Sequence, residues 1–130
     1  MMETLGFVII MALVSSGDIK TVNSFALEYE NEQNPKLDNK IIIADMLQAA
    51  TQFVDYTERI HKRAEILEGL GIMGMDALHL ACAEYADSDL LVTCDDTFIK
   101  KVQKIDNVNV NVVTLLEFVS TEVIKNESGD

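Results

Sequence analysis

The chain has 130 residues and a formal net charge of −12, and 48% of its residues are hydrophobic. This length and composition suit a single globular domain with its own core and exclude an intrinsically disordered chain. The negative charge argues against a broad basic footprint for nucleic acid. It does not exclude a metal-dependent nuclease, because bound cations would offset part of the charge at the site.

The first apolar run, residues 7–14, is too short to span a bilayer, and no basic residue precedes it. A secretory signal is therefore unexpected, and no membrane association is predicted. We expect residues 2–16 to form a mostly buried helix that ends at Gly17. The two cysteines, Cys82 and Cys94, lie in apolar segments and form no CxxC motif. We expect two reduced core thiols in a cytoplasmic protein.

Strand-like and helical segments alternate along the rest of the chain. Ser24 and Thr57 are typical N-cap residues, and Pro35 and Gly69 mark helix ends. The expected strands are residues 19–23, 52–56, 90–93 and 108–113. The expected helices are residues 24–34, 37–50, 57–69, 74–83, 96–105 and 115–124. This alternation predicts one α/β domain over residues 1–124 with a parallel sheet covered on both faces, followed by a frayed tail, 125–130.

The helix predicted at residues 74–83 is apolar on almost every side and carries one carboxylate, Asp76, in its first turn. Such a helix is buried, and a buried carboxylate is costly unless it meets a cation or several donors. The apolar strand 90–93 is followed by Asp95 and Asp96. Ligands of open α/β sheets lie beyond the carboxyl ends of strands. We therefore expect these acids to converge where a hard divalent cation such as Mg²⁺ would bind.

Three segments, residues 24–30, 74–81 and 91–95, resemble motifs of the PIN-domain family of metal-dependent ribonucleases. The resemblance covers about residues 17–118. It implies a three-layer α/β sandwich with a short central parallel sheet. It also implies hydrolysis of RNA phosphodiesters with Mg²⁺ or Mn²⁺ as cofactor. Many bacterial and archaeal members resemble the toxin of a toxin–antitoxin pair, so the implied partners are RNA, an antitoxin protein and a second copy of the chain.

The resemblance also assigns the site residues. Glu30 is the better match to the glutamate that the family places in the helix after its second strand, and Glu28 is the second match. The catalytic and metal-binding set is then Glu30, Asp76 and Asp95, with Asp96 as a further metal ligand. Apart from the resemblance, Thr93 at the end of the strand could support the site through a hydrogen bond to a carboxylate, or could simply pack as a β-forming residue.

Each of these residues also has a plainer interpretation. Asp76 and Asp95 could simply stabilise the N-termini of helices in an unrelated α/β protein. Glu30 lies in a glutamate-rich helix, which is usually a solvated face. His79, one turn after Asp76, is expected to be a core histidine with a hydrogen-bond partner rather than a metal ligand.

The sequence departs from the family pattern at its start. Family members begin with a central strand that ends in an aspartate, and we expect both to be missing here, which leaves a gap between strands 19–23 and 90–93. Such a strand stabilises a fold by on the order of 6–15 kcal/mol, as much as the whole stability of a domain.

Three explanations stay open for the missing strand. Either the start is placed downstream of the true one, or the gene is a truncated remnant, or a partner chain or another segment of this chain fills the gap. We favour truncation and expect weak or absent ribonuclease activity. The alternative function is a non-catalytic module that engages an antitoxin or a dimer partner.

Overall fold

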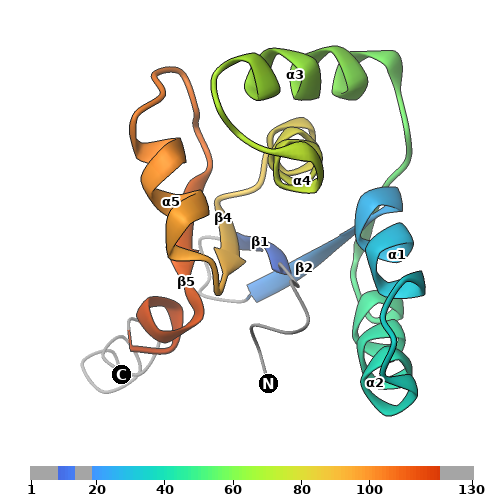
Figure 1. The fold of residues 1–130 in the computed structure, drawn as a ribbon. Coiled ribbons are helices and arrows are strands. Elements are labelled where there is room, and N and C mark those ends of the chain that lie inside the picture. The colour runs from blue at the N-terminus through green and yellow to red at the C-terminus, as the bar shows by residue number, and fades with distance from the viewer. Residues whose placement is uncertain (1–8, 14–18, 121–130) are drawn as a thin grey trace.

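The computed structural model describes residues 9–13 and 19–120, which fold into a mixed sheet with helices around it (Figure 1). The strands are β1 (Ile9–Leu13), β2 (Ile19–Ser24), β3 (Gln52–Val54), β4 (Leu90–Thr93) and β5 (Asn111–Thr114). The helices are α1 (Phe25–Glu32), α2 (Leu37–Gln48), α3 (Glu58–Gly69), α4 (Gly74–Tyr85) and α5 (Asp96–Gln103). Residues 115–120 are helical as well, and the predicted tail 125–130 lies outside the described residues.

The strand order of the sheet is β3-β2-β1-β4-β5. Strand β2 is parallel to β3 and β4 is parallel to β5, whereas the central β1 is antiparallel to both of its neighbours, β2 and β4. The predicted α/β fold, with parallel strands alternating with helices, is confirmed. The prediction of an entirely parallel sheet is wrong at the central strand.

Strand β1 also corrects the prediction of a helix over residues 2–16, because residues 9–13 are extended. Ile10 pairs with Val22 of β2, and Ile9 pairs with Val92 of β4. A short apolar run does not distinguish a strand from a buried helix. Strands β2 and β4 would otherwise leave two rows of backbone groups without partners, and a strand between them satisfies both rows. The gap expected at this position is therefore filled by a segment of the chain itself.

The helix boundaries follow local signals that the sequence contains. The Ser24 hydroxyl accepts a hydrogen bond from the Leu27 N–H at 3.0 Å, and the Thr57 hydroxyl accepts one from the Ile60 N–H at 3.1 Å. Both are the side-chain caps predicted for α1 and α3. After α3, Gly71 adopts a φ of 107°, a left-handed conformation that glycine takes at little cost.

The last strand begins later than predicted, at Asn111 rather than Val108. Val108 and Val110 pack against the core before the strand starts, so their alternation reflects burial and not pairing.

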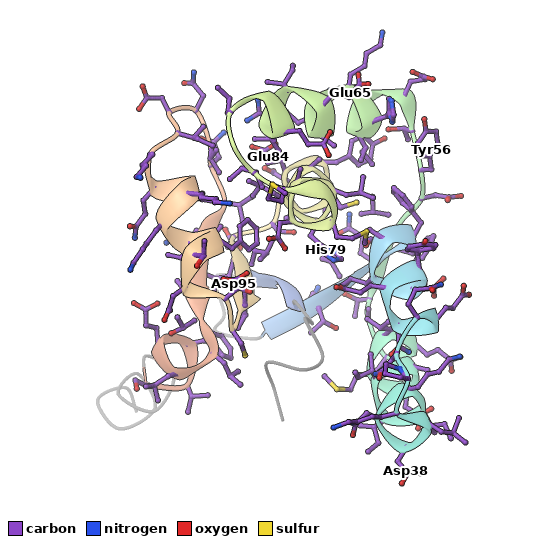
Figure 2. The ribbon with its side chains drawn as sticks, in the orientation of Figure 1. Asp38, Tyr56, Glu65, His79, Glu84 and Asp95 are labelled. Atoms are coloured by element: carbon purple, nitrogen blue, oxygen red, sulfur yellow. The ribbon has the colours of Figure 1, made fainter. Side chains whose placement is uncertain are left out.

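Helix α4 is the most buried helix of the described part. Its fully or almost fully buried residues are Ala77, His79, Leu80, Ala81, Cys82 and Ala83. Figure 1 shows α4 beside β4 and α1, with α3 lying across it. A charge pair joins the two stacked helices: Arg63 of α3 donates from Nε and an Nη to the two carboxylate oxygens of Glu84 at 2.7 and 3.0 Å. Figure 2 shows Glu84 between α3 and α4. This bidentate geometry is the strongest form of such a contact.

The two cysteines differ in environment. Cys82 is buried in α4 as predicted, whereas Cys94 is exposed, which corrects the prediction of two core thiols. Cys94 follows the end of β4 and lies in the turn before α5, so it is no longer on a buried strand. Among the described residues, no helix is long and apolar enough to cross a membrane.

Candidate active site

Asp76 lies in the first turn of α4 and is half-buried. Burial raises the pKa of this carboxyl, His79 lowers the pKa, and the negative charges of Asp95 and Glu30 raise it further. The positive charge of Lys101 lowers it. Glu30 belongs to α1 and Asp95 precedes α5, so the charges of carboxylates from two other elements act on Asp76. That Glu30, Asp76 and Asp95 share one metal site stays a prediction.

Glu30 reaches this centre through a contact with His79. Its Oε1 lies 2.8 Å from Nε2 of His79, and the histidine side chain has 0% of its surface exposed. An ionised carboxylate only accepts hydrogen bonds, so the Nε2–H of the imidazole is the donor. The other ring nitrogen, Nδ1, has no partner among the described residues. His79 is therefore a core histidine as predicted, and its one contact ties α1 to α4.

Glu28, the second match for the family glutamate, faces a different neighbour. It is exposed, and its carboxylate accepts a hydrogen bond from the side-chain amide of Asn23 at 2.9 Å. Of the two glutamates, Glu30 is the one that acts on Asp76.

Asp95 is the N-cap of α5. Its Oδ1 accepts hydrogen bonds from the backbone N–H groups of Thr97 at 2.9 Å and Phe98 at 3.3 Å. The side chain is exposed, and Figure 2 shows it at the start of α5, while His79 lies on the side of α4 that faces α1. The cap role and the electrostatic effect on Asp76 occur together in the same carboxylate.

Two supporting residues lie near Asp95. Thr93 is buried at the end of β4, and its hydroxyl accepts a hydrogen bond from the backbone N–H of Asp95 at 3.1 Å. It thus holds the backbone of the turn that carries Asp95. Asp96 is exposed in the first turn of α5.

A divalent metal ion suits the donor chemistry of this centre, because Mg²⁺ and Mn²⁺ prefer oxygen ligands. The geometry suits it less well. Within residues 9–13 and 19–120, no three His, Cys, Asp or Glu side chains are placed to hold one ion together. Glu30 already contacts His79, and Asp95 already caps α5. The described residues therefore do not form a three-carboxylate metal site in this arrangement.

Sequence reasoning missed two features of the site. One is the Glu30–His79 contact, for which a signal existed: His79 follows Asp76 by three residues and so shares its helix face. The other is Lys101 on α5, whose charge lowers the pKa of Asp76. No local pattern in the sequence indicates that these two side chains come near one another.

Comparison with known proteins agrees with the motifs. The PIN domain family model matches residues 20–105, which is more than half of the chain. The matched range begins within β2 and extends beyond α5, so it contains Glu30, Asp76 and Asp95 and leaves out β1. No curated protein matches the chain. PIN domains are generally nucleases that use divalent metal ions, and this chain belongs to the PIN-domain family.

Proposed function

We propose that this chain is a PIN-type ribonuclease of low activity that hydrolyses RNA phosphodiesters with Mg²⁺ or Mn²⁺, and that Asp76 is its central residue. The observation that supports this proposal is the electrostatic convergence on Asp76 of carboxylates from α1 and from the turn before α5. A cluster of like charges around a half-buried acid is costly as a purely structural arrangement. Such clusters are typical of functional sites.

Each residue has a distinct role in the proposal. Asp76 and Asp95 supply oxygen donors from α4 and from the end of β4. Glu30 adds a third negative charge, and the buried imidazole of His79 fixes its orientation. Thr93 positions the turn that carries Asp95, and Asp96 is a further ligand candidate. When bound, a divalent ion would lower the pKa of a water molecule and stabilise negative charge on the phosphate.

The activity is expected to be low for two reasons. The described carboxylates do not form a ready set of three ligands. In addition, β1 has the sequence Ile-Ile-Met-Ala-Leu and brings no acid to the centre of the sheet. Because Mg²⁺ is held by only a few protein ligands, the loss of one weakens its binding strongly.

The test is cleavage of a fluorescently labelled single-stranded RNA by the purified chain with and without Mn²⁺. The wild-type chain should cleave slowly and only with the metal, and Asp76→Asn should abolish the cleavage. Asp45→Asn, an exposed acid on α2, is the matched control and should keep it. Equal cleavage by the wild-type chain and Asp76→Asn, or cleavage that does not need a metal ion, would contradict the proposal.

A second candidate function is a binding module that engages a small antitoxin or a second copy of the chain. The observation in its favour is the outer surface of α2, where Ile41, Ile42 and Met46 are 54%, 58% and 45% exposed. Exposed apolar side chains that lie together often mark a protein interface.

Sedimentation velocity tests the dimer: the wild-type chain should associate as its concentration rises, and Ile42→Lys should stay monomeric. A wild-type chain that remains monomeric rules the dimer out.

A further inference from the structure

A second feature is a cavity of about 560 Å³ between the turn after α3 and the C-terminal end of α5. Leu70 and Ile105 supply its apolar wall, and Lys101 and Lys104 supply its positive charge. Asp106 also lines the cavity and is exposed. The cavity is open to solvent and large enough for part of an extended ligand.

The two lysines are unusual in this chain, in which 22 acidic residues face 10 basic ones. The ion pairs of the described residues are His61–Glu65, Arg63–Glu84 and His79–Glu30, so neither Lys101 nor Lys104 belongs to one. Lys101 lies in the last turn of α5 and Lys104 is its C-cap residue three positions later, which makes their side chains neighbours on the surface of the helix. Two unpaired ammonium groups in one cavity attract an anion, and lysine is a common binder of phosphate.

Lys101 connects this cavity with the candidate active site. Its side chain is half-buried, and its charge is near enough to lower the pKa of Asp76. Lys104 lies one turn farther along α5 and is exposed. A polyanion that passes Asp76 would therefore meet Lys101 first and Lys104 next.

We propose that this cavity holds backbone phosphates of a single-stranded RNA whose adjacent phosphate lies at Asp76. This inference rests on the proposed function and adds to it the direction in which the RNA leaves the site, along α5 toward the turn after α3. RNA fits better than an acidic peptide because the proposed function places an RNA phosphate at Asp76, and Lys101, whose charge acts on Asp76, also lines the cavity. The overall charge of −12 weakens RNA binding everywhere else, so these two lysines should dominate its dependence on salt.

The test is fluorescence anisotropy of a labelled single-stranded oligoribonucleotide over a series of salt concentrations. All proteins carry Asp76→Asn, which prevents cleavage. Lys101→Gln combined with Lys104→Gln should weaken binding and reduce the slope of log K against log salt by about 1.4, because each phosphate contact on a single strand contributes about 0.7. Lys100→Gln is the matched control: it removes the same charge from an exposed residue of α5 that does not line the cavity, and it should leave the slope unchanged.

The double Lys→Arg variant should restore the slope, which separates a lost charge from a damaged fold. The inference is overturned if the double Gln variant keeps the slope of the Lys100→Gln protein. It is also overturned if polyglutamate displaces the RNA as well as unlabelled RNA does. A chain with Asp76 intact could bind RNA through the two lysines and fail to hydrolyse it. That result would contradict the proposed activity but support the binding of RNA phosphates in the cavity.

Discussion

Glu30 of α1 and His79 of α4 lie 2.8 Å apart, Oε1 to Nε2, and this contact places an acid from one helix against the fully buried ring of another. It orients Glu30 at the edge of the candidate active site, and it gives the buried imidazole its one hydrogen bond among the described residues. The stability of the fold and the geometry of the site therefore depend on the same pair.

Replacing Glu30 should reveal this double role. Glu30→Ala leaves both ring nitrogens of His79 without a partner and should lower the free energy of unfolding by about 1–3 kcal/mol. Glu30→Gln keeps an oxygen acceptor and should lower it by less. Urea denaturation followed by circular dichroism measures both changes. Glu32→Ala replaces an exposed glutamate on the same helix and is the control. If it lowers the free energy of unfolding as much as Glu30→Ala does, the contact between Glu30 and His79 does not stabilise the fold.

Because the pKa of Asp76 is raised, we expect its contribution to the stability of the fold to fall as the pH rises. Its pKa in the folded chain is raised above the usual value by burial and by Asp95 and Glu30. The Asp76 carboxyl of an unfolded chain has a pKa of about 3.9. The folded state therefore keeps the Asp76 proton at pH values at which the unfolded chain has lost it. Stability is gained from this group below the usual pKa of aspartate and lost as the pH rises through the raised value.

Asp76→Asn should accordingly be more stable than the wild-type chain at neutral pH, and the difference should shrink as the pH is lowered toward the usual pKa of aspartate. Unfolding in urea at a series of pH values measures it, with Asp45→Asn as the control. An Asp76→Asn chain that is less stable than the wild type at neutral pH would mean that the carboxylate has a stabilising partner instead.

The two cysteines should react at very different rates. Burial raises the pKa of Cys82 to about 12, an effect that a hydrogen bond with Ser24 only partly offsets. The thiolate is the reactive form, so Cys82 should be inert in the native chain at neutral pH, whereas the exposed Cys94 should react. A colorimetric thiol reagent should thus titrate one thiol in the folded chain and two after unfolding. Two fast-reacting thiols in the native protein would contradict the burial of Cys82.

Strand β1 makes a further prediction. Met11 pairs with Thr21 on one side and with Leu90 on the other. Met11→Pro removes a backbone N–H donor from the centre of the sheet. An average substitution lowers the free energy of unfolding by about 1 kcal/mol, and Met11→Pro should lower it by more. Met11→Ile keeps the N–H and suits a strand, so it should have little effect. If Met11→Pro unfolds at the same urea concentration as the wild type, β1 contributes nothing to the fold.

The elements that could be predicted from the sequence are those with local signals. Ser24 and Thr57 cap their helices as expected, most apolar residues of α4 are buried, and β4 covers the predicted residues 90–93. The sequence motifs also identified Glu30, Asp76 and Asp95 as the acids to compare, because helix starts and strand ends determine where such residues lie.

The features that could not be predicted depend on packing between distant segments. Residues 9–13 form a strand because two neighbouring strands need backbone partners, which no window of the sequence shows. The contact between Glu30 and His79 spans 49 positions and depends on how α1 lies against α4. The effect of Lys101 on Asp76 likewise joins residues 25 positions apart and depends on how the chain folds.

The measurement that tests the central claim most directly is calorimetric titration of Mn²⁺ into the wild-type chain and into Asp76→Asn, Glu30→Gln and Asp95→Asn. If the three carboxylates act as one centre, the wild-type chain should bind one ion weakly, Asp76→Asn should lose that binding, and each of the other two variants should weaken it. Binding should also decrease at low pH, because protons compete for the same oxygens. Equal binding by the wild type and Asp76→Asn would show that Mn²⁺ binds elsewhere on this acidic chain, and it would contradict a nuclease centre at Asp76.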